Sequence, residues 1–244
     1  MFFEDPVLFS LGTIFGQPVV ITPWTLIGFV GNNVLFSLRV LVQWIASEKA
    51  RKCVAPRSFW WISLSASLIM ILYTLQRSTD PRFVESASAV PFLIGFVFTL
   101  VPYTRNLLIS YKAPQKLHML SYVFSAGIFM VCLFLIIQMD VPIVRTRWFI
   151  LGMIGSLIWY TRYIWQWLYS ERKKESAFPL LFWYVSLCGI TLNTIYAVMM
   201  RDIVFILGFL FNVVPIIRNI MLIKHAHRHA HSENKDQVCS PPEI

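Results

Sequence analysis

The sequence predicts an all-α integral membrane protein in which seven transmembrane helices form two parallel three-helix bundles joined by a linker helix. Three observations support this prediction: the composition, seven long apolar segments and an internal repeat. Of the 244 residues, 57% are hydrophobic and 14% are charged, whereas charged residues make up about 25% of a typical soluble domain. This composition excludes a soluble enzyme and a disordered basic protein.

Seven apolar segments follow one another along the chain, each bounded by charge, proline or both. A bilayer crossing needs about 20 mostly apolar residues, and lipid cannot satisfy exposed backbone groups, so each segment is predicted to be a helix. The segments are Trp24–Ala46, Phe59–Gln76, Ala87–Ile109, Leu117–Gln138, Trp148–Leu168, Leu180–Met199 and Ile203–Ile223. The stretch Val7–Ile21 is shorter and contains glycine and proline. We expect it to belong to an outer N-terminal segment, residues 1–23, that lies at the membrane interface.

The net charge of +9 is distributed unevenly between the two sides of these segments. Loops after the first, third and fifth segments, together with the C-terminal tail, hold twelve lysines and arginines. The opposite side holds five, namely Arg77, Arg82, Arg145, Arg147 and Arg201. The positive-inside rule then predicts a multi-pass protein with its N-terminus outside and its C-terminus in the cytoplasm. The basicity is explained by membrane orientation, so we expect no nucleic-acid partner.

An internal repeat covers six of the seven segments. The stretch RVLVQWIASEKARKCVAPRSFWWISL from Arg39 matches RYIWQWLYSERKKESAFPLLFWYVSL from Arg162, and GFVFTLVPYTRN from Gly95 matches GFLFNVVPIIRN from Gly208. Each copy contains three segments, so two copies with the same orientation need an odd number of helices between them. Leu117–Gln138 has no partner in either copy and is the predicted linker helix.

The repeat predicts the domain boundaries. The first copy occupies residues 24–110, the linker helix residues 111–140 and the second copy residues 141–224. Residues 225–244 form a histidine-rich cytoplasmic tail.

The motif QWxxSE, followed by a proline, by FW and S, and then by VPxxRN, resembles the lipid A biosynthesis N-terminal domain, which occurs at the N-terminus of some lipid-A-disaccharide synthases. That family is similar in helix plan to the SWEET and PQ-loop transporters, so the expected fold is SWEET-like. Neither copy contains the proline–glutamine dipeptide of those transporters; the dipeptide at Pro114–Gln115 lies in the predicted linker. The motif therefore does not predict the sugar-uniport mechanism of those transporters for this protein.

The resemblance implies a bacterial inner-membrane protein of lipid A or related envelope glycolipid biosynthesis. We expect it to bind and translocate a phosphorylated or lipid-linked sugar between its two copies. Two alternatives remain: a non-catalytic membrane anchor or accessory subunit of a lipid A glycosyltransferase, and a SWEET-like carrier of free sugars. Only about twenty residues follow the last apolar segment, so we expect no synthase activity from this chain. Membrane lipid is an expected partner, and homo-oligomerisation stays open.

Two repeat-related arginines, Arg39 and Arg162, lie inside apolar segments, with Gln43 and Gln166 four residues later on the same helix face. A charged residue within a span usually faces the bundle interior or an aqueous cavity. A guanidinium can bind a phosphate or carboxylate with two parallel hydrogen bonds. The alternative is that each arginine snorkels to the cytoplasmic interface and pairs with the glutamate nine residues later.

A second repeated pair consists of Arg105–Asn106 and Arg218–Asn219, each three residues after a proline. A proline-kinked helix could present these side chains to the same cavity as the first pair of arginines. Ordinary positive-inside anchoring is the alternative.

Asparagines at midspan complete the set of predicted substrate-binding residues. Asn193 and Asn212 stand opposite Met70 and Thr99 in the repeat alignment, and hydrogen bonds between helices are the alternative to sugar binding. The alignment that pairs Arg39 with Arg162 also places Asn32 and Asn33 opposite Gly155 and Ser156. The full predicted set is Arg39, Gln43, Arg105, Asn106, Arg162, Gln166, Asn193, Asn212, Arg218 and Asn219.

The remaining polar residues suggest no catalytic site, metal site or cofactor. The tail places His225, His227, His229 and His231 at alternate positions, on one side of an extended chain. A solvated tail is the preferred interpretation, because no cysteine or acid completes a metal site. No acidic residue is clearly at midspan, so proton coupling is not expected.

Overall fold

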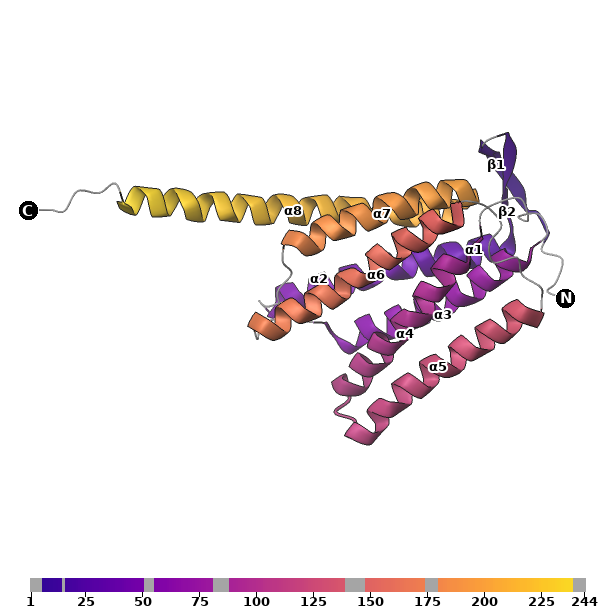
Figure 1. The fold of residues 1–244 in the computed structure, drawn as a ribbon, viewed down its shortest axis with the longest axis horizontal. Helices are drawn as coiled ribbons and strands as arrows, with labels where there is room; N and C mark the ends of the chain where they lie inside the picture. The colour runs from indigo at the N-terminus through magenta and orange to yellow at the C-terminus, as the bar shows by residue number, and fades with distance from the viewer. Residues whose placement is uncertain are drawn as a thin grey trace, which may run out of the picture.

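The computed structural model describes residues 6–14, 16–50, 55–80, 88–138, 148–173 and 180–238, and these are helical apart from an N-terminal β-hairpin (Figure 1). The hairpin strands are β1 (Phe9–Ile14) and β2 (Gln17–Ile21). The helices are α1 (Pro23–Phe29), the π-helix η1 (Val30–Leu35), α2 (Phe36–Ala50), α3 (Arg57–Thr79), α4 (Val90–Ser110), α5 (Gln115–Gln138), α6 (Trp148–Lys173), α7 (Leu180–Met200) and α8 (Ile203–Val238).

Six helical segments within the described residues are long and apolar enough to cross a membrane. They contain the predicted first, second, third, fourth, sixth and seventh segments, which confirms a helical membrane protein. Helix α6 coincides with the predicted fifth segment and has 26 residues, about 39 Å at 1.5 Å per residue. It is less apolar than the other six because Arg162 lies among tryptophans and tyrosines.

The N-terminal segment differs from the all-helical prediction, because Val7–Ile21 contains the hairpin. The strands pair antiparallel with Phe9 opposite Ile21. Gly16, at the turn, has φ +76°, a conformation that glycine adopts without steric cost. The chain then enters α1 through a capping box, in which the Thr22 hydroxyl accepts from the Thr25 amide at 3.1 Å.

Successive helices run in opposite directions between two ends of the molecule. We call the end with the hairpin and the α7–α8 turn the hairpin end, and the end with the α4–α5 turn the basic end (Figure 1). Helix α3 packs against α2 and α4, α7 packs against α6 and α8, and α5 packs against α4. The two copies thus show the same order of helix contacts.

Contacts between the copies pair the third helix of one with the first helix of the other: α4 packs against α6, and α8 packs against η1 and α1. Two repeat-related glycines allow this approach. A Cβ on Gly95 would overlap Tyr160 of α6, and a Cβ on Gly208 would lie 2.0 Å from the amide nitrogen of Asn32. Only glycine leaves room for these side chains.

Four phenylalanines form the centre of this contact. Phe92 and Phe96 of α4 are the repeat counterparts of Phe205 and Phe209 of α8. The ring centroids of Phe92 and Phe205 are 4.4 Å apart, and those of Phe92 and Phe209 are 5.3 Å apart. Phe92 and Phe205 are almost completely buried. The tilted ring pairs match the geometry that aromatic side chains prefer, so both copies supply one shared core.

The π-helix η1 changes the alignment of the two copies. A Cβ on Gly28 would lie 2.7 Å from the ring of Tyr73, and a Cβ on Gly152 would lie 2.5 Å from the ring of Tyr196, the repeat counterpart of Tyr73. Gly28 and Gly152 are therefore structurally equivalent, whereas the alignment that pairs Arg39 with Arg162 places Gly28 opposite the residue before Gly152. A π-helical turn accommodates one extra residue.

The same shift makes Gly31 equivalent to Gly155, because their neighbours Met70 and Asn193 are repeat counterparts. The predicted pairing of Asn32 with Gly155 was wrong by one position.

Helix α8 continues to Val238 and projects past the other helices toward the C-terminus (Figure 1). The tail is therefore not an extended chain between residues 225 and 238. The side chains of the four histidines lie outside the described residues.

We expect Gly152→Ala to destabilise the protein by about 1–3 kcal/mol, the typical cost of overpacking a core. Tyr196 cannot yield easily, since it is fully buried and its hydroxyl is hydrogen-bonded. The thermal midpoint in detergent measures the effect. Gly127→Ala is the matched control, because a Cβ there meets nothing within 4 Å. Equal midpoints for the two variants would contradict the packing argument.

Candidate functional site

The first predicted arginine lies in a cradle of aromatic side chains within the first copy. The Arg39 guanidinium donates to the Tyr103 hydroxyl at 2.7 Å and lies 3.5 Å from the Ser63 hydroxyl. Its central carbon is 4.5 Å from the ring centroid of Phe36 and 5.8 Å from that of Phe59. Desolvated cation–π contacts of this kind contribute up to about 2 kcal/mol. The aromatic rings thus hold a half-buried charge inside the helix bundle.

The second predicted arginine lies in the equivalent cradle of the second copy. The central carbon of Arg162 is 3.3 Å from the ring centroid of Trp159 and 5.6 Å from that of Phe182. Trp159 and Phe182 are the repeat counterparts of Phe36 and Phe59. Arg162 is 8% exposed, so most of its side chain is buried.

The two cradles differ at one position, where Ile216 of the second copy replaces Tyr103. The hydroxyl that accepts from Arg39 therefore has no counterpart beside Arg162. The contacts described for each arginine come from its own copy, from α2, α3 and α4 or from α6 and α7. The side chains of Glu48 and Glu171, the other predicted partners, lie outside the described residues.

The other predicted residues near the basic end are less buried. Gln43 and Asn106 are half-buried, Arg105 and Arg218 are exposed, and the side chain of Gln166 lies outside the described residues. No described contact joins these side chains to the arginine cradles.

Two of the predicted asparagines donate to carbonyls of their own helix. Asn219 donates to the Pro215 carbonyl at 2.7 Å, and Asn212 donates to the Gly208 carbonyl at 2.6 Å, both within α8. Asn193 is 1% exposed, and its carbonyl oxygen has no hydrogen-bond partner among the described residues.

Both copies carry an aromatic–basic contact at the basic end. In the first copy, Trp61 donates to the Tyr111 hydroxyl at 3.2 Å, and the Arg57 guanidinium lies 4.6 Å from the Tyr111 ring. In the second copy, the Lys224 ammonium lies 5.4 Å from the ring of Tyr184. Exposed tyrosine, tryptophan and basic residues are typical of the headgroup region of a membrane protein.

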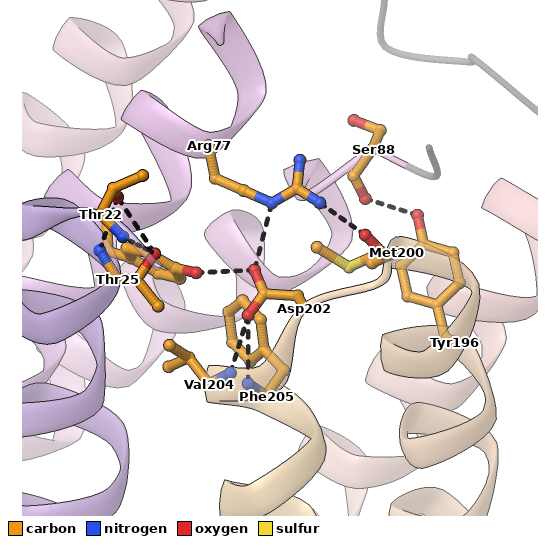
Figure 2. A network of polar contacts seen from close by, with 10 residues as sticks. Thr22, Thr25, Arg77, Ser88, Tyr196, Met200, Asp202, Val204 and Phe205 are labelled. Atoms are coloured by element: carbon orange, nitrogen blue, oxygen red, sulfur yellow. Dashed lines mark hydrogen bonds and ion pairs between the residues drawn. The ribbon is translucent and has the colours of Figure 1, made fainter. Parts of the chain in front are cut away.

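A buried polar network lies at the hairpin end (Figure 2). Asp202 forms an ion pair with Arg77, with 3.3 Å between carboxylate oxygen and Nε, and the two side chains are 1% and 4% exposed. The Tyr73 hydroxyl donates to the same oxygen at 2.8 Å. The other carboxylate oxygen accepts from the backbone amides of Val204 and Phe205 at the start of α8. We call Tyr73, Arg77 and Asp202 the polar triad.

On the opposite side of the interface, Tyr196 donates to the Ser88 carbonyl at 2.5 Å (Figure 2). Tyr73 and Tyr196 are repeat counterparts, so each tyrosine reaches the start of the third helix of the other copy. Hydrogen bonds from buried hydroxyls therefore join the copies on both sides of the contact.

The sequence does not predict the polar triad, because Arg77 and Asp202 border apolar segments and resemble ordinary loop charges. The available signal was Tyr73, which is repeated as Tyr196 and lies one turn before Arg77.

The described residues contain no cluster of three or more histidines, cysteines or acids that could hold a metal ion. A guanidinium group presents a planar set of hydrogen-bond donors that matches a carboxylate or a phosphate.

Comparison with known proteins places these features in context. A family model described as Lipid A Biosynthesis N-terminal domain matches residues 27–108 and 151–221, one match in each copy. The lipid-A-disaccharide synthase of Chlamydia pneumoniae is 28% identical over 215 residues, which cover 83% of this chain and 34% of the relative. The lipid-A-disaccharide synthase of Chlamydia felis is 26% identical over 227 residues, with 84% and 35% covered.

The chain thus spans about a third of the length of these curated relatives. No solved structure matches the chain.

We expect Tyr103→Phe to lower the free energy of unfolding by about 1.5 kcal/mol, because Arg39 loses a charge-assisted hydrogen bond. Tyr122→Phe, on the exposed surface of α5, is the matched control and should change stability by less than about 0.5 kcal/mol. Denaturation in detergent compares the two variants. An equal loss in both would show that the Arg39 contact contributes nothing.

We expect Arg77→Met to cost about 3–5 kcal/mol, because it leaves the buried Asp202 carboxylate without its counter-charge. The double variant Arg77→Met/Asp202→Asn should recover part of this loss, since no uncompensated charge remains. Arg201→Met, in the same turn, serves as the control. Thermal midpoints of all three distinguish the cases, and additive losses in the double variant would contradict an interaction between Arg77 and Asp202.

Proposed function

Since the chain belongs to the lipid A biosynthesis N-terminal domain family, we propose that it binds a phosphorylated or lipid-linked sugar between its two copies and moves it across the bacterial inner membrane. The single observation that carries this proposal is the repeated cradle of Arg39 and Arg162. A charged residue within an apolar span is costly and often marks a substrate pathway. The anionic headgroup of an envelope glycolipid is the substrate chemistry that a repeated guanidinium would recognise.

The position of the cradles supports recognition from the cytoplasmic side. Ser63 lies six residues from the start of α3, about 9 Å along the helix, so the Arg39 cradle lies just inside the basic end. The exposed Arg105 and Arg218 at the same end would attract a phosphate toward it by long-range electrostatics.

The proposed arrangement is a 3+1+3 architecture with seven membrane-spanning helices. Helices α1 to α4, including η1, form the first bundle, α5 is the linker helix, and α6 to α8 form the second bundle. Two observations support this arrangement. The helices of both copies make contacts in the same order, and the third helix of each copy packs against the first helix of the other. Such parallel repeats place a substrate pathway at their interface. The N-terminus lies outside and the C-terminus in the cytoplasm.

We expect the double variant Arg39→Gln/Arg162→Gln to lose at least tenfold in affinity for a phosphorylated disaccharide glycolipid. One lost charge-assisted contact of about 1.5–3 kcal/mol corresponds to about ten- to a hundredfold. Binding is measured in nanodiscs with a fluorescent glycolipid.

The matched control Lys49→Gln/Lys112→Gln removes two exposed positive charges and should bind normally. Unchanged binding by a folded arginine double variant would overturn the proposal. An uncharged free sugar tested in the same assay distinguishes a SWEET-like carrier.

A second candidate function is a membrane anchor or accessory subunit for a lipid A glycosyltransferase. The observation that favours it is that relatives named lipid-A-disaccharide synthase contain this region within a chain about three times as long. This region would then hold the enzyme at the cytoplasmic face. Co-purification of the organism's own lipid A glycosyltransferase would support this function, whereas its absence under conditions that preserve the membrane would count against it.

A further inference from the structure

We infer that the polar triad is a gate that closes the interface between the two copies at the hairpin end. The inference rests on the proposed translocation function, because a gate has a purpose only where something passes. It assigns a role to Tyr73, Arg77 and Asp202 that the arginine cradles do not fill.

The triad joins the two copies directly. Tyr73 and Arg77 lie on α3 of the first copy, whereas Asp202 begins α8 of the second. Arg77 also donates to the Met200 carbonyl at the end of α7. Separation of the copies at this end must therefore break an ion pair and two hydrogen bonds (Figure 2).

The repeat shows that the fold does not require an ion pair at this position. The counterparts of Arg77 and Asp202 are Met200 and Ala89, which are almost completely buried. An apolar pair therefore fills the equivalent place on the other side of the interface. A buried ion pair is often no more stabilising than apolar residues of similar volume, so its presence on one side only points to a function other than stability.

Polar groups continue below the triad into the interface. Asn32 and Asn33 of η1 donate to the Val204 carbonyl at 2.8 and 3.1 Å. The Asn33 side-chain oxygen is buried and has no hydrogen-bond partner among the described residues. An unsatisfied buried polar atom costs about 1–3 kcal/mol. Water would remove this cost if the interface opened, so these polar groups suit a pathway observed in its closed state.

The hairpin covers the triad from the outer side. A small cavity of about 10 Å³ is lined by Val19 and Val20 of β2 and by the three residues of the triad. This volume accommodates about one water molecule. In the proposal, movement of the hairpin or of the two copies enlarges this space.

Thiol accessibility tests the gate without any substrate. Asn33→Cys is the reporter, in a background where Cys53, Cys132, Cys188 and Cys239 are serine. Asn33 lies ten residues, about 15 Å along the helix, from the start of α1, and it contacts Val204 next to the triad. A membrane-impermeant charged maleimide is added outside intact cells. Ser10→Cys, exposed on β1, is the positive control for sidedness and should react in every background.

With the triad intact, we expect the reporter to stay unlabelled. Neutralising the pair by Arg77→Gln/Asp202→Asn should raise the labelling rate at least tenfold, because the amide keeps the contacts to α8 while the ion pair is lost. Tyr73→Phe removes a single hydroxyl and should give an intermediate rate. Folding of each variant is judged by size-exclusion chromatography and thermal midpoint. If the double variant does not fold, the labelling rate of Tyr73→Phe still tests the gate.

Arg201 lies in the same turn and also lines the cavity, but it does not belong to the triad. Arg201→Gln is therefore the matched control and should leave the reporter unlabelled. Folded triad variants that label no faster than the intact protein would overturn the gate, and so would equal labelling in Arg201→Gln. Arg39→Gln/Arg162→Gln should stay unlabelled. Loss of glycolipid binding and failure of the gate are therefore separate outcomes.

Discussion

The contact between the third helix of each copy and the first helix of the other is the constraint on which the rest of the structure depends. Four phenylalanines fill its centre, and Gly95 and Gly208 allow the helices to approach. Lipid tails are as apolar as leucine, so the hydrophobic effect does not drive helices together inside a membrane. Close packing and buried hydrogen bonds must do so instead. Small residues and aromatic rings at repeat-related positions meet this requirement from both copies at once.

The departures from repeat symmetry indicate where function has been added to a common scaffold. The first copy has an extra residue in η1, a tyrosine beside Arg39, and Arg77 in place of methionine. The second copy has isoleucine beside Arg162 and contributes Asp202. Packing alone would favour equal copies, because the same contacts are made twice. Differences that introduce buried charge or unpaired polar atoms therefore need an explanation beyond stability, and the proposed translocation pathway supplies one.

The proposed pathway separates two kinds of arginine by their surroundings. Arg39 and Arg162 lie against aromatic rings, whose faces attract a cation, and in the proposal they bind an anionic headgroup. Arg77 lies against a carboxylate in an almost completely buried pair, so its charge is cancelled. In the proposal, the first kind serves recognition at the basic end and the second serves closure at the hairpin end.

The sequence alone determined that this is a helical membrane protein, placed its apolar segments to within a few residues and revealed the repeat. These features depend on chain-local hydropathy and on residue identity, which need no knowledge of distant contacts. It also singled out Arg39 and Arg162, since charges within apolar runs stand out.

Only the tertiary structure decided that residues 9–21 form a hairpin, that η1 shifts the alignment by one residue, and that Asp202 meets Arg77. These features were not predictable because each results from a partner far away in the chain. The one-residue shift is visible only in the contacts of glycines with the rings of Tyr73 and Tyr196. In the sequence, Arg77 and Asp202 look like loop charges, and only the structure shows that they form a buried ion pair between the copies.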